Sequence, residues 1–283
     1  MLDDLEQWVR RHPRLVALTG AGLSAASGIP TYRDDEGRWQ RSDPIQHRDF
    51  VTRASSRRRY WARSMAGWGH VQRAEPNGAH HAFAALERLG HVRLLATQNV
   101  DRLHQRAGHR RVVDLHGRLD RVKCLDCAAT RDRDDFQLEL ERLNGIFART
   151  VVGIRPDGDA ELGDADLEAF VVPTCGACGG TWMPDVVFFG GYVPRDRVGA
   201  IRDAIAGADA LLVAGSSLMV YSGYRFCRLA AELGKPLLIV NRGRTRADEL
   251  ATLKITRDCD ETLTALAARL GAGEAHSTRV RSM

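Results

Sequence analysis

The stretch that decides the fold of this 283-residue chain is Leu15-Val16-Ala17-Leu18-Thr19-Gly20-Ala21-Gly22-Leu23-Ser24. Its apolar first half predicts a buried parallel strand. Gly20 and Gly22 then allow a tight turn and a close approach of the backbone to a bound group. The small residues that follow predict the start of a helix, whose free N–H groups and positive dipole end favour phosphate. This pattern indicates a dinucleotide site, although Ala25 occupies the third glycine position of G-x-G-x-x-G.

An unusual tail follows the glycine turn, with the sequence Ser27-Gly28-Ile29-Pro30-Thr31-Tyr32-Arg33. A plain dinucleotide-binding fold has no need for an aromatic residue and an arginine on a proline-stiffened loop. No acidic residue stands alone at the end of a second strand roughly 20 residues later, as hydride-transferring dinucleotide enzymes typically show. Both observations count against an ordinary dehydrogenase.

The composition indicates a globular protein with a mildly basic surface. Hydrophobic residues make up 44% of the chain, and 41 basic residues exceed 36 acidic ones by 5. This length allows one large domain, or one large and one small. The charge is spread along the chain and does not argue for a nucleic-acid partner. No apolar run reaches the roughly 18 residues of a membrane span, and the N-terminus lacks a signal core, so we expect a cytoplasmic protein that binds neither nucleic acid nor a membrane.

Strands and helices alternate along most of the chain. Strands are expected over 15–18, 91–97, 111–115, 186–190, 210–214 and 236–240, and helices over 2–12, 53–72, 79–89, 196–207, 222–233 and 260–270. This alternation predicts an α/β fold with a doubly wound parallel sheet. Residues 121–182 lose the pattern and hold four cysteines, which indicates a separate metal-binding module.

Three parts and a tail are therefore expected. Residues 1–40, 90–120 and 183–272 would form a Rossmann-like dinucleotide-binding domain. Residues 41–89 would form a helical module, and residues 121–182 a zinc-binding module. Residues 273–283, after the glycine at 271, would form a flexible tail.

Polar and glycine residues follow five separate predicted strands. These strand ends are Gly20-Ala21-Gly22, Gln98-Asn99-Val100-Asp101, His116-Gly117, Gly215-Ser216-Ser217 and Asn241-Arg242-Gly243. In a parallel sheet the ligand site lies beyond the carboxyl ends of the strands. We therefore expect these residues to meet at one edge and to form the functional site.

Several of these side chains have a chemical and a structural interpretation. His116 suits general-base work near neutral pH, or is a satisfied structural histidine. Asn99 and Asp101 flank Val100, so in an extended segment they face one side and can bind a primary amide such as that of nicotinamide. Either could instead cap a helix. Ser216 and Ser217 could hold a ribose or phosphate, or cap the next helix, and Asn241 could bind a ribose hydroxyl.

Four cysteines form two C-x-x-C pairs, Cys124 with Cys127 and Cys175 with Cys178. Each pair can hold one edge of the tetrahedron that Zn²⁺ prefers. A redox role for a single pair is the competing interpretation, and the presence of two pairs without a thioredoxin-like context weakens it. Because four thiolates leave no open position, we predict one structural zinc ion that takes no part in catalysis.

In their order and spacing these motifs resemble those of the sirtuins, a family of NAD-dependent protein deacylases. The resemblance covers about residues 5 to 270. It rests on the glycine turn with its tail, the Thr97–Asp101 segment with Leu103 and His104, His116-Gly117, both C-x-x-C pairs, Gly215–Leu218 and Asn241-x-Gly243. Further segments resemble the class II branch.

The resemblance implies an NAD-dependent lysine deacylase that transfers the acyl group to ADP-ribose and releases nicotinamide. His116 would act as the base on a ribose hydroxyl, Asn99 and Asp101 would bind the nicotinamide amide, and the Tyr32–Arg33 loop would exclude water. The implied NAD-binding residues are Gly20, Ala21, Gly22, Ser24, Pro30, Thr31, Tyr32, Arg33, Trp39, Gln98, Asn99, Val100, Asp101, Gly215, Ser216, Ser217, Asn241, Arg242, Gly243 and Cys259. An NAD-dependent protein mono-ADP-ribosyltransferase is the alternative function, since it would use the same site.

The implied protein substrate carries acylated lysines, and we expect the enzyme to be a monomer. The substrate peptide would pair with the segment Val187, Phe188, Phe189 and Gly190. Tyr60 and Arg63 match a Tyr-x-x-Arg pair that grips acidic acyl chains in related deacylases, so a preference for dicarboxyl-type acyl groups is one hypothesis; a solvated helix face is the other. The chain departs from the family pattern at Thr31, Met183 and Gly191.

Overall fold

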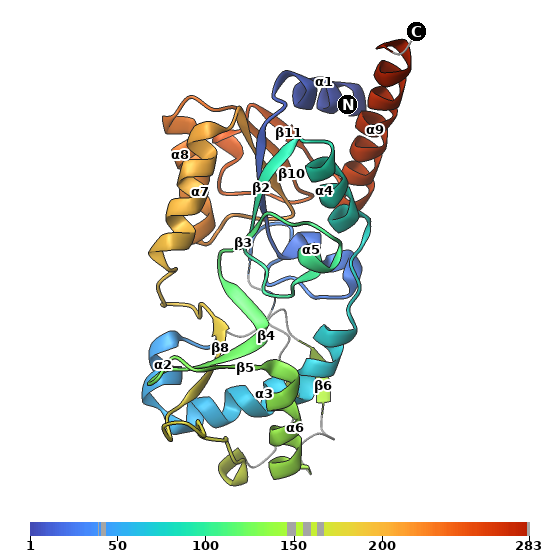
Figure 1. Ribbon diagram of the computed structural model, residues 1–283. Helices are drawn as coiled ribbons and strands as arrows, with labels where there is room; N and C mark the ends of the chain where they lie inside the picture. The colour runs from blue at the N-terminus through green and yellow to red at the C-terminus, as the bar shows by residue number, and fades with distance from the viewer. Residues whose placement is uncertain (39, 41–43, 146–150, 155–159, 163–166, 282–283) are drawn as a thin grey trace.

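The larger of two lobes is built on a six-stranded parallel sheet with the strand order β11-β10-β9-β1-β2-β3 (Figure 1). The strands are β1 (Leu15–Thr19), β2 (Val92–Thr97), β3 (Val112–Asp114), β9 (Ala210–Ala214), β10 (Leu237–Val240) and β11 (Leu253–Ile255). Since the chain builds one half of the sheet on each side of β1, the topological switch point lies between β1 and β9. Our computed structural model describes residues 1–38, 40, 44–145, 151–154, 160–162 and 167–281.

Both faces of this sheet are covered by helices, because alternate strand residues are apolar on both sides. Leu15 and Ala17 of β1 belong to the core beneath α1 (Leu2–Arg11), α4 (Gly78–Arg88) and α9 (Cys259–Arg281). Val16 and Leu18 belong to the core beneath α7 (Arg195–Gly207) and α8 (Tyr221–Glu232). Side chains alternate between the two faces of a strand. The predicted α/β fold with a doubly wound sheet is therefore confirmed.

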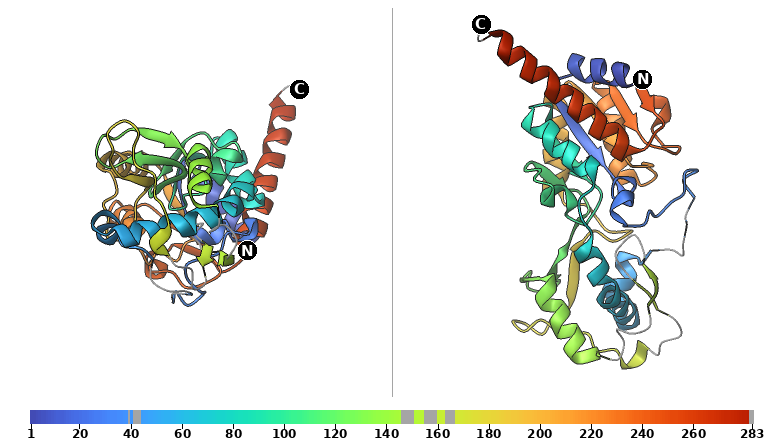
Figure 2. Two further views of the ribbon diagram at one scale, coloured as in Figure 1. Left: turned by 90° about the horizontal axis from the view of Figure 1, so that it is seen from below. Right: turned by 90° about the vertical axis from the view of Figure 1, so that its right-hand side faces the viewer.

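The smaller lobe is built on an antiparallel sheet with the strand order β5-β4-β8. Its elements are α2 (His47–Thr52), α3 (Ala54–Arg73), β4 (Gly117–Cys124), β5 (Thr130–Asp132), α6 (Arg133–Asn144), β8 (Trp182–Val186) and the hairpin β6 (Val151–Ile154) with β7 (Ala160–Leu162). Trp61 of α3 packs on Phe136 of α6 with ring centroids 4.6 Å apart. The expected helical and zinc-binding parts thus share one core, and they lie together at one end of the molecule (Figure 2).

Two expected domain boundaries differ from the structure. Helix α4 was placed in the helical module, but Ala79, Phe83 and Leu86 are buried in the core of the larger lobe. The expected strand 186–190 is instead β8, which ends at Val186 and pairs with β4 of the smaller lobe. The amide of Val187 still donates to the carbonyl of His116, in register with β4, at 2.7 Å.

Two expected helices also differ. In place of an α-helix after the glycine turn, the chain forms two short 3₁₀ turns, Ala21–Leu23 and Ala25–Ser27. The amides of Leu23 and Ser24 donate to the carbonyls of Gly20 and Ala21, the three-residue spacing of a 3₁₀ turn, and the amide of Gly22 donates to the carbonyl of Gly215 at 2.8 Å. Helix α9 continues to Arg281, so residues 273–281 are helical where a flexible tail was expected. Its end projects from the larger lobe (Figure 2).

Strand β11 and the short helix α5 (Leu103–Arg106) were not anticipated. Three residues are too few to show a strand period, so Leu253–Ile255 gave little signal. Among the helices that the structure describes, none combines the length and the apolar character that a membrane span requires.

Candidate active site

A cavity of about 700 Å³ lies where the carboxyl ends of the large sheet meet the smaller lobe. This volume is within the usual range for small-molecule sites, roughly 300–1,000 Å³. All five predicted strand ends contribute to its wall. The predicted site residues that line it are Gly20, Ala21, Gly22, Ser24, Thr31, Tyr32, Arg33, Tyr60, Gln98, Asn99, Val100, Asp101, His116, Val187, Phe188, Phe189, Gly190, Gly215, Ser216, Ser217, Asn241 and Gly243.

Four predicted residues are not among those that line the cavity within the described part of the chain, namely Pro30, Arg63, Arg242 and Cys259. Arg242 forms an ion pair with Asp258 at 2.7 Å. Cys259 begins α9 and donates its thiol to the carbonyl of Val240 at 3.3 Å. Trp39 lies outside the described residues.

The glycines of the first turn let two backbone segments touch across the switch point. A Cβ atom on Gly22 would lie 2.9 Å from the carbonyl oxygen of Gly215. Gly215 has a φ of +62°, and a Cβ atom there would lie 2.3 Å from the nitrogen of Leu23. Both positions therefore require glycine. These glycines allow the turn after β1 to pack against the turn after β9. The two turns together form the floor of the cavity.

Ser24 joins the two side chains that were predicted to bind an amide. Its hydroxyl donates to the carboxylate of Asp101 at 2.7 Å and accepts from Asn99 Nδ2 at 2.9 Å. The same Nδ2 donates to the carbonyl of Gly20 at 3.1 Å. Both hydrogens of the Asn99 amide are thus used, so only its Oδ1 is left to bind a ligand.

Asp101 combines a structural hydrogen bond with a place on the wall of the cavity. Its Oδ1 accepts from the amide of Leu103 at 2.9 Å, at the start of α5. Its carboxyl group lines the cavity, and burial raises its pKa above the ordinary value. Asn99 and Asp101 together present acceptor oxygens, and these suit the NH₂ group of a primary amide.

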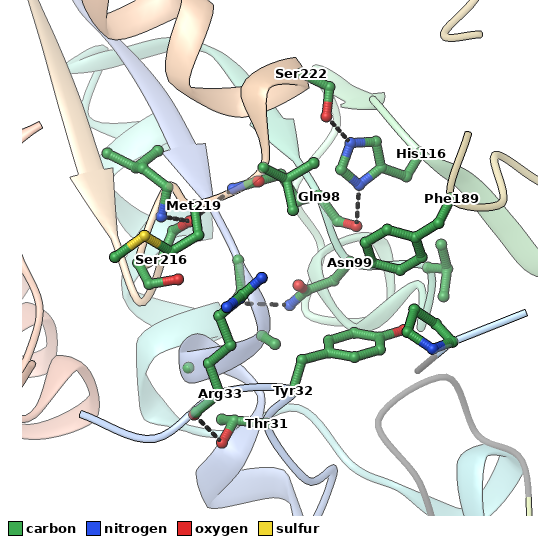
Figure 3. Close-up of a pocket in the computed structure, with 18 of the residues that line it drawn as sticks. Thr31, Tyr32, Arg33, Gln98, Asn99, His116, Phe189, Ser216, Met219 and Ser222 are labelled. Carbon is green, nitrogen blue, oxygen red and sulfur yellow. Dashed lines mark hydrogen bonds between the residues drawn. The ribbon is translucent and has the colours of Figure 1, made fainter. Parts of the chain in front are cut away.

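His116 stands between Gln98 and Ser222 (Figure 3). Its Nδ1 lies 3.1 Å from the carbonyl oxygen of Gln98, and its Nε2 lies 2.7 Å from Ser222 Oγ. A carbonyl oxygen can only accept, so Nδ1 carries the hydrogen and Nε2 the lone pair. Burial lowers the pKa of His116 to about 4. The imidazole is therefore neutral at physiological pH, with Nε2 available as a base.

The serines after β9 make internal bonds. Ser216 Oγ accepts from Gln98 Nε2 at 2.8 Å and from the amide of Leu218 at 3.2 Å. The carbonyl of Ser217 accepts from the amide of Arg246 at 2.9 Å. Ser216 thus holds the side chain of Gln98, whose carbonyl in turn holds His116.

The predicted cofactor loop forms one wall of the cavity. Thr31 donates its hydroxyl to the carbonyl of Arg33 at 3.0 Å, and Arg33 donates to the carbonyl of Gly37 at 2.6 Å. Tyr32 packs edge-on against Phe189 of the facing lobe, with ring centroids 6.1 Å apart (Figure 3). The two rings close the cavity at the junction of the lobes.

The two residues of the predicted Tyr60–Arg63 pair stand differently toward the cavity. Tyr60 lines it, and this residue is 2% exposed and packs against Phe50 and Phe188. Arg63 is half-buried on the same helix and is not among the lining residues that the structure describes.

Some lining residues were not predicted as functional, among them Ile29, Met219, Ser222 and Arg225. Ser222 and Arg225 belong to the first turns of α8. The only sequence signal for them was their position shortly after the Gly215-Ser216-Ser217 strand end.

The four predicted metal ligands meet at the tip of the smaller lobe. The sulfur atoms of Cys124, Cys127, Cys175 and Cys178 all lie within 4.8 Å of one another. Cys124 Sγ lies 3.6 Å from Cys178 Sγ, and Cys127 Sγ lies 3.7 Å from Cys175 Sγ. A tetrahedron with Zn–S bonds of about 2.3 Å has edges of about 3.8 Å. The cluster therefore fits a structural zinc ion.

Comparison with known proteins gives consistent matches. A model of the Sir2 family matches residues 20–222. The NAD-dependent protein deacetylase 2 of Bradyrhizobium diazoefficiens is 53% identical over 261 residues, which cover 92% of this chain and 96% of that protein. An NAD-dependent protein deacetylase of Bordetella bronchiseptica is 54% identical over 262 residues, with 93% and 96% covered.

Solved structures agree along nearly the full length. A structure described as "Sir2-p53 peptide-NAD+" has a TM-score of 0.77 and 29% identity, and covers 96% of this chain and 99% of its own. One described as "Structural Basis for the Mechanism and Regulation of Sir2 Enzymes" has a TM-score of 0.76 and 32% identity, with 96% and 98% covered.

Proposed function

This chain belongs to the Sir2 family and is an NAD-dependent protein deacetylase, and we propose that its reaction takes place in the cavity between the lobes, with His116 as general base. NAD supplies a glycosidic bond whose cleavage releases nicotinamide and leaves ADP-ribose to take the acyl group. The chain's own residues bind the reactants, exclude water and move one proton.

Asn99 and Asp101 would hold the nicotinamide amide. Asn99 Oδ1 and the remaining lone pairs of the Asp101 carboxylate can accept from the amide, and Ser24 fixes both side chains by hydrogen bonds of 2.7 and 2.9 Å. A ligand NH₂ group can therefore be bound without rearranging the protein. The glycine turns at Gly20–Gly22 and Gly215, which form the cavity floor, would lie against the pyrophosphate.

His116 would accept a proton from a ribose hydroxyl at Nε2. The hydrogen bond from Nδ1 to the Gln98 carbonyl fixes the tautomer that leaves Nε2 without a hydrogen. The same carbonyl would stabilise the imidazolium that forms, because its partner nitrogen keeps its hydrogen. The lowered pKa keeps the base neutral at the start of each turnover.

The side chains of Tyr32 and Phe189 would keep water from the reacting carbon. The two rings meet from opposite lobes, and apolar Ile29, Val71 and Leu119 line the same cavity. Exclusion of water matters here because water competes with the acyl-lysine as the nucleophile.

The acyl-lysine peptide would bind along the segment Val187–Gly190, whose residues all line the cavity. One edge of this segment is already paired with the start of α2, because the carbonyl of Phe189 accepts from the amide of His47 at 2.8 Å. Tyr192, 96% exposed, and Tyr221, 53% exposed, stand beside this segment at the cavity mouth. Exposed aromatic rings of this kind suit contacts with flanking peptide residues.

The observation that carries this proposal is the neutral, oriented His116 in one cavity with Asn99 and Asp101. The test compares His116→Ala with His81→Ala, a variant of an exposed histidine on α4. We expect His116→Ala to keep NAD binding and zinc and to lose at least about 100-fold in acyl transfer, the contribution of a general base. Acetyl-ADP-ribose formation, measured by mass spectrometry, at the level of His81→Ala would refute the assignment.

The same assay separates deacetylation from mono-ADP-ribosyl transfer. With NAD labelled in the adenosine part, deacetylation leaves the label in a small acyl-ADP-ribose, whereas ADP-ribosyl transfer leaves it on protein. We expect the label in the small molecule only. The class II branch, the monomeric state, the cytoplasmic location and the absence of a nucleic-acid partner stay predictions.

A further inference from the structure

We propose that Ser222 is a positioning residue for the base. In the free enzyme its hydroxyl is the hydrogen-bond partner of His116 Nε2, and the ribose hydroxyl takes over this position when it binds. This inference rests on the proposed role of His116. It concerns a residue of α8 that contacts the base from the side opposite Gln98 (Figure 3).

The direction of both hydrogen bonds follows from the chemistry of the partners. The Gln98 carbonyl can only accept, so it receives the hydrogen of Nδ1 over 3.1 Å. In the neutral ring Nε2 then has a lone pair and no hydrogen. The Ser222 hydroxyl, 2.7 Å from Nε2, must be the donor of the second bond. Ser222 therefore satisfies the one atom of His116 that performs the chemistry.

Ser222 is itself held in place. Arg225 Nε donates to the carbonyl of Ser222 at 3.1 Å. The next residue, Gly223, packs so closely on the Gln98 side chain that a Cβ atom would lie 2.5 Å from Gln98 Oε1. The two residues that bind His116 are thus fixed relative to each other, and the imidazole is held between them.

The surroundings of His116 determine which way this bond runs. Burial is the largest cause of its lowered pKa, and the guanidinium groups of Arg225 on α8 and Arg197 on α7 also disfavour the charged ring. The ring is therefore neutral, and Ser222 donates. Once Nε2 has taken up a proton, it becomes a donor, and the Ser222 hydroxyl can rotate and accept from it.

This arrangement has a kinetic consequence. The single lone pair of Nε2 accepts one strong hydrogen bond, so the ribose hydroxyl must replace Ser222 in the reacting complex. Ser222 then stabilises the neutral ring in the free enzyme only. Loss of the Ser222 hydroxyl should therefore shift the acid limb of the pH profile of kcat/KM, which reports ionisations of the free enzyme. The acid limb of kcat, which reports ionisations of the enzyme–substrate complex, should stay unchanged.

The experiment uses Ser222→Ala, with Ser222→Thr as the control that keeps the hydroxyl, in zinc-loaded full-length protein. The ¹⁵N resonances of the His116 ring, assigned by their loss in His116→Gln, are followed from about pH 3 to about pH 8, a range that includes the pKa of about 4. We expect the Nε2 resonance in Ser222→Ala to move to that of an unpartnered acceptor. Loss of one hydrogen bond to the neutral ring raises its pKa by about half a pH unit to one pH unit. Ser222→Thr should match the wild type.

The same variants are then assayed with acetyl-lysine peptide and NAD. The acid limb of kcat/KM should move upward in Ser222→Ala by the amount seen by NMR, while that of kcat stays in place. An unchanged Nε2 resonance in Ser222→Ala, or a threonine variant that behaves like alanine, overturns the proposal. Because the NMR measurement needs no substrate, an inactive wild type would contradict the proposed function separately.

Discussion

The hydroxyl of Ser24 donates to the carboxylate of Asp101 over 2.7 Å, and this bond connects the first turn of the larger lobe to the segment after β2. Asp101 is 77 residues away in the sequence. Its carboxyl group is buried and its pKa is raised for that reason. Together with the bond from the Leu103 amide, this bond therefore stabilises the charged form of the carboxyl group that faces the proposed nicotinamide site.

Replacement of Ser24 by alanine should impair the enzyme. Hydrogen bonds to charged groups contribute about 1.5–3 kcal/mol, so we expect kcat/KM for NAD to fall about 10-fold to 100-fold. Ser27→Ala is the matched control. Ser27 lies on the same loop as Ser24 and accepts a hydrogen bond from Asn77, and it is not among the described residues that line the cavity. Steady-state rates of the two variants that differ by less than twofold would contradict this role.

Gly215→Ala should destabilise the larger lobe. Its φ of +62° and a contact of 2.3 Å to the Leu23 nitrogen leave no room for a Cβ atom. We expect a loss of about 3 kcal/mol in the free energy of unfolding, from backbone strain and overpacking. Gly199→Ala on α7, where no atom lies within 4 Å, should instead gain about 0.5–1 kcal/mol. Urea unfolding of both variants decides; equal stability would show that the two turns can separate.

Loss of zinc should unfold the smaller lobe. Cys124 and Cys175 are buried in the same core as Tyr60 and Phe188, which line the cavity. We expect Cys175→Ser to lose its zinc and to lower Tm by about 10 °C, corresponding to a few kcal/mol. Cys227→Ala, a buried cysteine of α8 outside the cluster, should keep one zinc ion per chain. Metal analysis and thermal melts test both, and a zinc-free Cys175→Ser with wild-type Tm would be the contrary result.

The stability of the protein should fall on mild acidification, in part through His116. Its pKa is about 4 in the folded protein and 6.5 in the reference state. Below pH 6.5 the unfolded chain binds a proton that the folded chain does not, so the free energy of unfolding decreases as the pH falls from 6.5 to 4. The expected loss is about 1 kcal/mol between pH 6.5 and pH 5.5.

His116→Gln should remove this part of the pH dependence. The comparison is urea unfolding at pH 6.5 and pH 5.5 for wild type, His116→Gln and the exposed-residue control His81→Gln. Other titrating groups, including buried His80 with its pKa also lowered to about 4 by burial, cancel in the difference. The same slope in all three proteins would mean that His116 protonates normally in the folded state.

Acyl preference should not depend on Arg63. Because the arginine is not among the described lining residues, we expect it to make no contact with the carboxylate of a dicarboxyl-type acyl group in the cavity. We expect acetyl-lysine peptide to be preferred over succinyl-lysine peptide, and Arg63→Ala to leave the ratio of their kcat/KM values within about twofold, as expected for a surface change. A selective loss of succinyl turnover in Arg63→Ala would restore the sequence-based hypothesis.

Much of the fold followed from local patterns. Apolar runs such as Leu15–Thr19 and Ala210–Ala214 are buried on both faces. Every central strand of a parallel sheet is covered by helices on both sides and therefore needs such an apolar run. The convergence of strand ends followed from topology alone, which is why His116, Asn99 and Asp101 could be placed together. The cysteine cluster followed from ligand chemistry, since spacing within each pair is fixed by the metal.

The errors have a common physical origin in long-range contacts. The glycine turn forms 3₁₀ turns in place of an α-helix, and its Gly22 amide binds Gly215, almost 200 residues away. Helix α4 joined the larger lobe because α9, from the far end of the chain, packs on it. Ser222 was missed because its importance comes only from its contact with His116.

His116 lies in the short link that connects the two lobes. Only Leu115 and His116 separate β3 of the larger lobe from β4 of the smaller lobe. Gly117, at a φ of +89°, makes the sharp turn against the carbonyl of Asp185. A rotation of one lobe against the other at this link would change the torsion angles beside the base, so the orientation of the imidazole depends on how the two lobes are set.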